Sequence, residues 1–513
     1  RALSEDPSNE LTQQQLERLT PMLGDAEALA RTYEEQVAEV EDPVLAAQLH
    51  MKAARIRENQ LEDYDNAIAH YRRVLELDEL HLEAATSLER LFQLNERYEE
   101  LAHIYLKKAT ILPSLDEQKQ YLYRAAALYE ELLERPKDSI KVYHQALELD
   151  PEDVTSMDKL IELNLRLEQW EPLLEVYNQK AEIVFDPDEK KRLYSEVGAV
   201  YEQELKDNVK AIDSYQRILE IDPDDIGALS RLDTLYQATE AWADLLSVLE
   251  READLAADPM EVIGYRYRIA DLHHHQLDDA LRSIDIYRDI LDVQPDHQPT
   301  LTALEELIGT DTEAVMAASV LEPIYRQLGD WPKLIAVHEV QIKHEEDPLR
   351  QVELLHQVAE LYEMQLDDAP NAFSAYARAL PLDNRHDVTL GSLERLAEYT
   401  DKWGEVTALY DTEIHKIRED RPEDVVDMAL RTAQIYEVHL GDVNNAIDRY
   451  RYVVEADEGH VQAIEALDRL FEATERWAEL ADILQKEVHI AATPDDMLNL
   501  QFRLGQVRQQ YLD

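Results

Sequence analysis

Aromatic residues recur at nearly regular intervals along the 513 residues of this chain. The five tryptophans, Trp170, Trp242, Trp331, Trp403 and Trp477, are separated by 72, 89, 72 and 74 residues. A second column of tyrosines moves in step with them, at Tyr71, Tyr143, Tyr215, Tyr287, Tyr376 and Tyr450. A fixed period of this kind is the signature of a repeat array, in which each unit packs mainly on its neighbours.

Three further columns keep the same register and indicate helical hairpins. One position holds only small residues, such as Ala126 and Gly198, which let two helices approach closely. Another holds proline, which follows aspartate in four copies, as at Asp186–Pro187. Such a pair favours a helix start because Asp caps and Pro fits the first turn. The third column is leucine, at Leu133, Leu205, Leu277, Leu366 and Leu440 among others. Apolar residues between these positions follow helical spacing, so each period of about 72 residues contains two hairpins.

Half of each unit resembles the tetratricopeptide repeat family. Ser139, Tyr143, Ala146 and Pro151 stand at the spacing of that family's second-helix small residue, aromatic, alanine and terminal proline, although the link between the two helices is longer by one residue. The hairpins that carry the tryptophans look like degenerate copies, as in long arrays of the bacterial type. The resemblance implies an all-α fold, an α-α superhelix of antiparallel hairpins whose first helices line a concave groove.

One interval of 89 residues breaks the period and predicts an extra helix. The segment that begins at Leu304 recurs 17 residues later at Leu321, and Gly309 with Thr310-x-x-Glu313 supplies a helix stop and a capping box. We expect residues 309–327 to bend the array, the more so because of Pro323. The predicted organisation is one repeat stretch at 1–308, the insertion at 309–327, and a second stretch at 328–513 that ends inside a repeat.

No motif predicts catalysis, a metal ion or a cofactor. Cysteine is absent, and the three consecutive histidines, His273–His275, would point about 100° apart on a helix and could not converge on one ion. Acidic pairs are numerous but predict solvated faces, because nothing in the sequence provides an apolar pocket around them. The tryptophan column predicts helix packing, with a ligand-stacking ladder as the alternative. The sequence therefore predicts a protein that is not an enzyme.

The charge balance restricts the partners. With 51 Lys and Arg against 110 Asp and Glu, the formal net charge is -59, which disfavours direct contact with nucleic acid and allows a basic partner. No apolar run is long enough for a membrane span. These features favour the cytoplasm and leave the periplasm open, since the chain starts with Arg1 and we expect its N-terminus to be truncated. They leave the oligomeric state undetermined.

Partner contacts are expected where equivalent positions vary between copies. By the family resemblance, two adjacent columns on the first helices face the groove, and basic and aromatic residues persist there in a very acidic chain. An acidic column that includes Glu58 and Glu437 either pairs with those basic residues or forms an acidic rail. Alternatively, the residues of the varied columns are simply exposed to solvent and contact no partner. The predicted contact residues are Met51, Lys52, Tyr123, Arg124, Tyr267, Arg268, His356, Gln357 and Arg431.

The leading functional hypothesis is a non-catalytic scaffold or adaptor that binds segments of a partner protein on its groove or surface. Two alternatives remain open on the sequence alone. The strong negative charge also suits a chaperone or buffer for a basic protein. A peptide-sensing regulator is the third possibility, although such regulators usually carry an effector domain.

Overall fold

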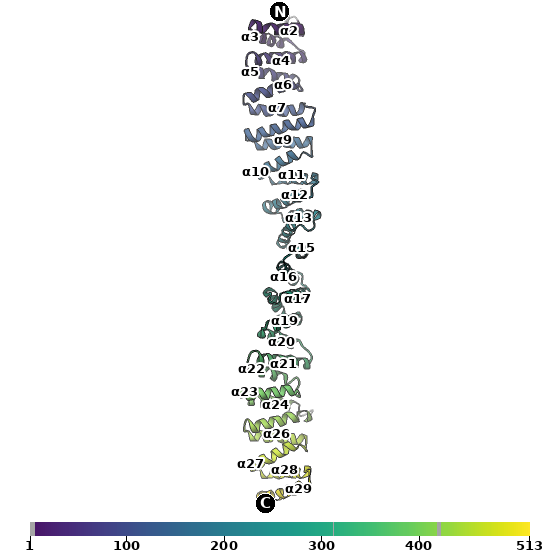
Figure 1. Cartoon of the computed structure of the whole chain (residues 1–513), viewed down its shortest axis with the longest axis vertical. Coiled ribbons are helices and arrows are strands. Elements are labelled where there is room, and N and C mark those ends of the chain that lie inside the picture. The colour runs from purple at the N-terminus through teal and green to yellow at the C-terminus, as the bar shows by residue number, and fades with distance from the viewer. Residues whose placement is uncertain (1–5, 311, 418–421, 513) are drawn as a thin grey trace. The chain divides into compact units, whose positions relative to one another are not determined.

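The computed structural model describes residues 6–310, 312–417 and 422–512. In this part of the chain the fold is all-α, with 28 α-helices that follow one another as hairpins. The chain divides into two compact units, Arg1–Leu255 and Ala256–Asp513. Within each unit a helix packs chiefly on the helices next to it along the chain (Figure 1). The predicted fold class is therefore confirmed.

The N-terminal unit alternates first and second helices of successive hairpins. The first helices after the opening pair are α4, α6, α8, α10, α12 and α14, and the second helices are the odd-numbered ones. Their bounds are α2 (Glu10–Leu23), α3 (Ala26–Glu39), α4 (Pro43–Asn59), α5 (Tyr64–Leu77), α6 (Leu82–Leu94), α7 (Tyr98–Ile111), α8 (Leu115–Ala127), α9 (Pro136–Leu149), α10 (Val154–Arg166), α11 (Trp170–Ile183), α12 (Pro187–Val200), α13 (Asn208–Ile221), α14 (Ile226–Ala238) and α15 (Trp242–Leu255).

The C-terminal unit repeats this alternation but interrupts it with one extra helix, α19. Its first helices include α21, α23, α25, α27 and α29, and α18 and α19 occupy the place that one first helix takes in other copies. The bounds are α16 (Pro259–His275), α17 (Ala280–Val293), α18 (Gln298–Ile308), α19 (Ala314–Leu328), α20 (Trp331–His344), α21 (Pro348–Met364), α22 (Ala369–Ala379), α23 (Asp387–Thr400), α24 (Trp403–Ile417), the 3-10 turn η3 (Pro422–Val425), α25 (Val426–Val438), α26 (Val443–Ala456), α27 (Val461–Ala473), α28 (Trp477–Ile490) and α29 (Pro494–Val507).

Aspartates start many of these helices, as the Asp-Pro pairs predict. Asp42, Asp186, Asp258 and Asp347 each accept a hydrogen bond from a backbone N–H of the first turn, and Pro follows each of them as the first helical residue. Proline costs nothing there because its missing N–H would have no partner inside the helix. The helix starts inferred from these pairs are confirmed.

Several first helices end in a wide turn that accommodates the extra residue of the link. Such turns follow α8, α12 and α29, at η1 (Leu128–Leu132), η2 (Tyr201–Leu205) and η4 (Arg508–Leu512). After α8, the backbone N–H of Leu133 donates to the carbonyl of Leu128, five residues earlier, at 3.0 Å. A wider loop of this kind takes up one residue more than an α-helical turn.

The turns within hairpins contain a residue in the left-handed conformation, and this residue is rarely glycine. Non-glycine residues there have φ between 52° and 56°. Backbones of this conformation favour Gly, and sometimes Asn, because a side chain crowds the carbonyl. The residues are Glu62, Glu96, Glu134, Glu168, Lys206, Glu240, Asp278, Asp367, Asp401 and Glu475. These positions carry local backbone strain that the packed helices on either side maintain.

Replacing Glu240 by glycine is expected to raise the stability of the α14–α15 hairpin by about 0.5–1 kcal/mol. The gain from relieving the left-handed strain exceeds the entropy that glycine adds to the unfolded chain. Glu240→Ala is the matched control, because alanine removes the same carboxylate but keeps a Cβ. Amide hydrogen exchange of α14 and α15 measures both variants, and equal protection in the two would contradict the strain argument.

The tyrosine column lies in the core, between the two helices of a hairpin. These tyrosines are 0% to 4% exposed. The small residue on the facing first helix makes room for each ring: a Cβ built on Gly198 would lie 2.7 Å from the Tyr215 ring. The tryptophans are half-buried, and Trp170, Trp331, Trp403 and Trp477 pack at the edges of hydrophobic clusters. Both columns therefore hold helices together.

The segment predicted to carry an extra helix contains α19, which begins at Ala314 and runs through Pro323 to Leu328. Thr310 donates a hydrogen bond to the carboxylate of Glu313 at 2.9 Å, just before the helix. α19 packs against both α18 and α20. The predicted bend, and the division of the chain at residues 309–327, remain predictions; the contacts group the chain on either side of Leu255 instead.

Candidate functional site

The column that contains Tyr123 is occupied by contacts within the array. The Tyr123 hydroxyl donates to the carboxylate of Asp153, the cap of α10, at 2.7 Å. At the equivalent place, His356 Nε2 lies 2.8 Å from the hydroxyl of Thr389 in α23. Tyr267 makes an edge contact with the His297 ring, at 5.8 Å between centroids, and Met51 is 5% exposed. Tyr123, His356 and Tyr267 thus each contact the start of the next hairpin's first helix.

The neighbouring column pairs mainly with acids of the array itself. Arg431 Nε lies 2.9 Å from Asp427, and its Nη1 lies 3.3 Å from Glu394 on α23. Lys52 lies 2.8 Å from Glu17, and the guanidinium of Arg124 lies 3.8 Å from Glu89. Gln357 and Arg268 are half-buried. Whether these predicted positions contact a partner remains a prediction, but the charges of Arg431, Lys52 and Arg124 already have acidic neighbours.

The acidic column of the first helices has two sets of partners that the sequence did not identify. The carboxylates of Glu58 and Glu437 accept hydrogen bonds from the hydroxyls of Tyr71 and Tyr450, at 2.8 and 2.9 Å. The same column pairs with arginines on the following first helix, as in Arg469–Glu437 at 2.6 Å. The other such pairs are Arg90–Glu58, Arg166–Glu130, Arg231–Glu202 and Arg395–Glu363. The column therefore braces successive hairpins.

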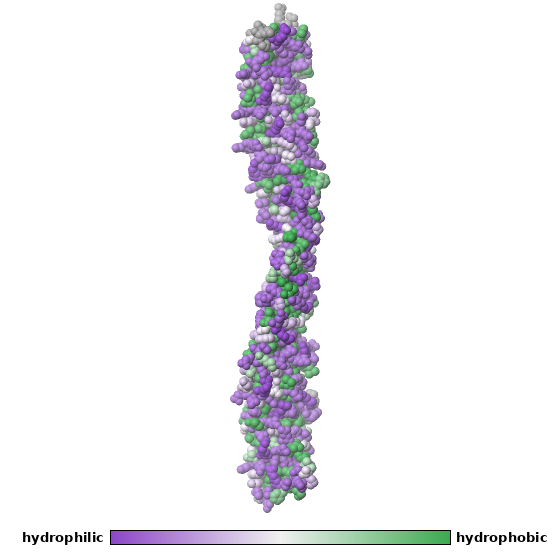
Figure 2. Space-filling model, in the orientation of Figure 1, coloured by the Kyte–Doolittle hydropathy of each residue, from purple (hydrophilic) through white to green (hydrophobic). Residues whose placement is uncertain are grey.

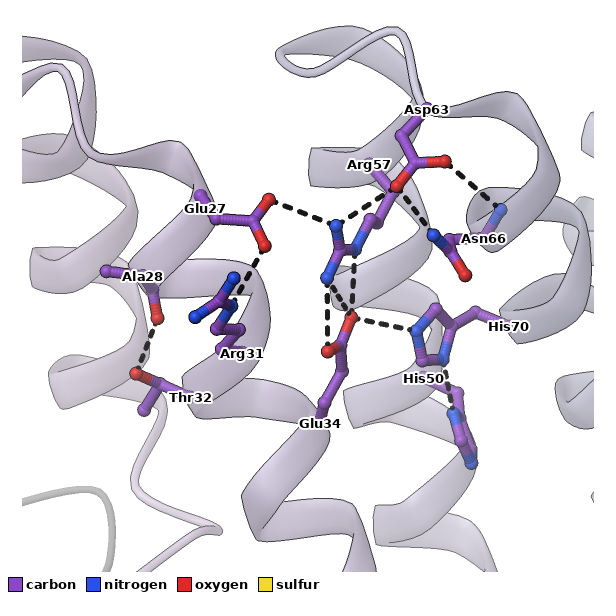
Figure 3. A network of polar contacts seen from close by, with 10 residues as sticks. All are labelled: Glu27, Ala28, Arg31, Thr32, Glu34, His50, Arg57, Asp63, Asn66 and His70. Carbon is purple, nitrogen blue, oxygen red and sulfur yellow. Dashed lines mark hydrogen bonds and ion pairs between the residues drawn. The ribbon is translucent and has the colours of Figure 1, made fainter.

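A buried polar network holds α3, α4 and α5 together (Figure 3). Arg57, 8% exposed, forms two hydrogen bonds with Glu34, at 2.9 and 3.1 Å, and further bonds with Glu27 and Asp63 at 3.1 and 3.0 Å. His70 joins the network through Glu34, at 3.1 Å. A guanidinium with planar, forked donors suits several carboxylates at once. This network links α3, α4 and α5 through the guanidinium of Arg57.

His50 extends the same network and is held neutral by its surroundings. Its Nδ1 lies 2.9 Å from Nδ1 of His70, so one ring donates and the other accepts. Burial, then His70, then Arg73 lower the pKa of His50 to about 4. The His50 ring is therefore neutral at neutral pH, chiefly because burial disfavours its charged form.

One cavity of the C-terminal unit lies between the first helices α23, α25 and α27. Its volume is about 790 Å³, and it includes Arg431 from the predicted contact columns. Val438, 71% exposed, provides apolar surface, and the Trp403 ring stacks on His439 with centroids 3.8 Å apart. Its charged lining residues are Glu394, Asp427, Glu437, Glu465, Arg431 and Arg469. Four acids against two arginines make the cavity suitable for a basic segment with apolar side chains.

Trp403 lines the cavity, but the rings of Trp403 and Trp477 already stack on other side chains of the array. Trp403 stacks on His439, and Trp477 stacks on Tyr511 with centroids 3.8 Å apart and planes 9° apart. Each ring thus lies on a residue at the end of the following first helix. Elsewhere, Figure 2 shows hydrophilic residues over most of the visible surface, with hydrophobic ones scattered among them.

The three histidines of α16 lie close together but make separate contacts. The rings of His274 and His275 stack with centroids 4.2 Å apart, while His273 Nδ1 lies 3.6 Å from Asp279 and His275 Nε2 lies 3.4 Å from Asp271. Across the described ranges, no three His, Cys, Asp or Glu side chains are grouped so as to hold a metal ion. The helices described here also include none with the length and apolarity needed to cross a bilayer.

Two segments match known family models, each described as tetratricopeptide repeat. They are residues 47–79, which cover α4 and α5, and residues 317–352, which cover most of α19 and all of α20. A search of curated protein sequences gave no match. The second match shows that the helix of the insertion forms a recognisable repeat with α20.

Solved structures with similar helical repeats are distant in sequence. YrrB, described as a TPR protein with an unusual peptide-binding site, is 20% identical over 39% of this chain and 97% of its own, with a TM-score of 0.20. Naa15/Naa10 bound to HypK-THB is 12% identical over 91% of this chain and 97% of its own, with a TM-score of 0.28. The P58(IPK) TPR domain is 14% identical over 70% and 99%, with a TM-score of 0.19. At these TM-scores the likenesses carry no inference about ligands.

Proposed function

Because the chain is a tetratricopeptide-repeat protein, and such arrays are generally protein-interaction modules, we propose that it is a scaffold that binds a basic, partly apolar segment of a partner protein. The contact surface is the cavity between α23, α25 and α27. The observation that carries the proposal is the excess of carboxylates in this cavity beside exposed apolar surface at Val438. No catalytic family matched the chain, and repeat scaffolds of this kind are typically non-catalytic.

Hydrogen bonds within the array make some of the varied positions less suitable for binding a partner. Tyr123 and His356 use their polar atoms inside the array, so a partner at these copies would have to displace existing hydrogen bonds. In the cavity, by contrast, Val438 and Glu465 are exposed, and neither has to give up a buried contact. We therefore place partner recognition at the cavity ahead of the other copies.

A photo-crosslinking residue, p-benzoylphenylalanine, tests this surface when it replaces Val438. Val44 of α4 is the matched control, since it is 65% exposed but lies outside the cavity. We expect the Val438 probe, in cells, to capture segments that carry Lys or Arg next to apolar residues. A synthetic copy of the captured segment should then bind Val438→Asp about tenfold more weakly than Val44→Asp, because apolar burial is lost.

The salt dependence of binding tests the electrostatic part of the proposal. Affinity for the captured segment should fall as salt is raised from low to physiological concentration, because exposed charges are screened. Equal capture at Val44 and Val438, or an affinity that ignores both salt and Val438→Asp, would contradict the assignment of this cavity.

A further inference from the structure

Each copy places a polar side chain, buried in all copies but one, at the junction of a second helix with the first helices on either side. In the sequence, this position lies ten residues after the aromatic residue that begins the second helix. It therefore recurs at the same intervals as the tryptophan column. Buried polar groups require partners. The occupants are Lys108, Lys180, Glu252, Gln341, Glu413 and Glu487, of which all but the half-buried Gln341 are 8% exposed or less.

Where the occupant is lysine, acids of the adjacent first helices receive its ammonium. Lys108 pairs with Glu89 of α6 and donates to the Tyr121 hydroxyl at 2.6 Å. Lys180 pairs with Asp158 of α10 at 2.7 Å and with Glu189 of α12 at 3.2 Å. The junction is therefore built to hold a buried ammonium, and three positions supply the carboxylates.

In the last copy, all three of these positions are acidic but the lysine is missing. Asp468 stands where Glu89 does, nine residues before the aromatic; Glu465 and Asp496 stand where Asp158 and Glu189 do. No other copy combines acids at all three positions. Glu487 takes the place of the lysine, so the junction gains a fourth carboxylate in place of the cation.

The carboxylate of Glu487 lacks the partner that a buried charge requires. The residue is 8% exposed, and its Oε2 has no hydrogen-bond partner among the residues that the structure describes; the same holds for Oδ1 of Asp468. Arg503 is bonded to Asp468 and Glu472 instead. In the preceding copy, the equivalent Glu413 accepts a hydrogen bond from Lys416 at 2.7 Å.

Glu487 lines a cavity of about 490 Å³ between α27, α28 and α29. Ile464, Ile490 and Leu500 form apolar walls, and Glu465, Asp468 and Asp496 are among its acidic lining residues. A lysine has a four-carbon apolar stem and a compact cationic head with three donors. The walls fit the stem, and the carboxylates fit the head.

We propose that this cavity binds a lysine side chain of a partner protein, whose ammonium takes the place that Lys108 and Lys180 fill in earlier copies. The inference rests on the proposed scaffold function and deepens it, because it assigns one residue of the partner to one cavity. The cavity shares Glu465 with the larger cavity between α23, α25 and α27, so a single basic segment can reach both.

Binding should depend on pH in the neutral range. Burial, followed by the charge of Asp468, raises the pKa of Glu487 to about 7, while Arg503 opposes this rise. The charged groups that face Glu487 are Glu465 and Asp468 from α27, and Asp496 and Arg503 from α29. Because an ammonium favours the ionised carboxylate, affinity should rise from pH 6 to pH 8, and binding should release a proton.

Methyl-resolved NMR of the full chain, with labelled isoleucine methyl groups, tests the proposal with three short peptides. They are Ac-Gly-Lys-Gly-NH2 and the same peptide with arginine or norleucine in place of lysine. The lysine peptide should shift the methyl signals of Ile464 and Ile490. Its affinity should be about tenfold higher at pH 8 than at pH 6, because the ionised fraction of a carboxyl group with a pKa of about 7 rises about tenfold between these pH values. The norleucine peptide has the stem without the charge and should bind at least tenfold more weakly.

Two variants separate this site from the wider groove. Glu487→Gln should weaken the lysine peptide at least tenfold at pH 8, whereas Glu413→Gln, the matched change in the preceding copy, should leave its affinity unchanged. Equal binding of the arginine and lysine peptides, or no effect of Glu487→Gln, overturns the lysine assignment. Such a result would not affect the outcome of the capture experiment at Val438. Failure of the lysine assignment can therefore be distinguished from failure of the scaffold proposal.

Discussion

Replacing Arg57 by alanine is expected to lower the stability of the α3–α5 region by about 2–4 kcal/mol. Arg57 is 8% exposed and hydrogen-bonds to Glu34, Glu27 and Asp63. Its removal leaves three carboxylates close together around a site that water enters poorly. The loss is smaller than for a fully buried pair, because these carboxylates retain side-chain exposures of 28% to 43%.

Arg31 provides the matched control for this prediction, because it pairs with the same Glu27, at 2.9 Å, from a side chain that is 68% exposed. Arg31→Ala should change stability by less than about 0.5 kcal/mol, since exposed ion pairs contribute little. Hydrogen exchange of the α3, α4 and α5 amides measures both variants. Equal protection in the two variants would show that the network in Figure 3 has no particular stabilising role.

Replacing Glu487 by lysine is expected to raise the stability of the α27–α29 region by about 2–3 kcal/mol at pH 8. The change removes a buried carboxylate without a hydrogen-bond partner at Oε2 in the described structure, and reproduces the arrangement around Lys108, with Asp468 as its acid. Arg503 then stands where Arg124 stands near Lys108, so the nearby guanidinium is already tolerated in one copy.

The pH dependence of this gain follows from the raised pKa of Glu487, about 7 in the folded chain against an ordinary value of 4.5. The folded state binds the proton more tightly, so the wild-type chain loses stability as pH rises from 4.5 through 7. The difference between variant and wild type should therefore be larger at pH 8 than at pH 5.

Asp482→Lys makes the same charge change at an exposed position of α28 and should stay within about 0.5 kcal/mol of wild type. Hydrogen exchange of α28 and α29 at both pH values compares the three chains. A Glu487→Lys variant no more protected than Asp482→Lys would contradict the prediction.

The sequence was sufficient to predict the hairpins because their determinants are local and periodic. The tyrosine and small-residue columns, together with Asp186–Pro187 and its equivalents, identify which faces pack and where helices start. The left-handed turns could not be predicted, since residues such as Glu168 and Glu240 give no local signal for that conformation. There the packed helices override the preference of the single residue.

The polar pairs were harder to predict, because each depends on which residues meet across different copies. The Glu58 column was expected to pair with basic residues of its own helix or to stay unpaired; its partners are Tyr71 and Arg90. A useful signal was present at Arg57, which occupies the column that holds Tyr129 and Tyr201 in later copies. Arg508 occupies the same column in the last copy, but Arg57 is buried, and a buried arginine requires acids nearby.

The insertion of α19 has a consequence for how such an array can change over generations. Because helices contact chiefly their immediate neighbours along the chain, 17 additional residues fit into the array while the column pattern on either side stays the same. Each copy can therefore mutate nearly independently of distant ones. Selection can adjust the number of helices that separate two recognition positions while leaving both positions intact, which makes the spacing between partner segments an evolvable property of the chain.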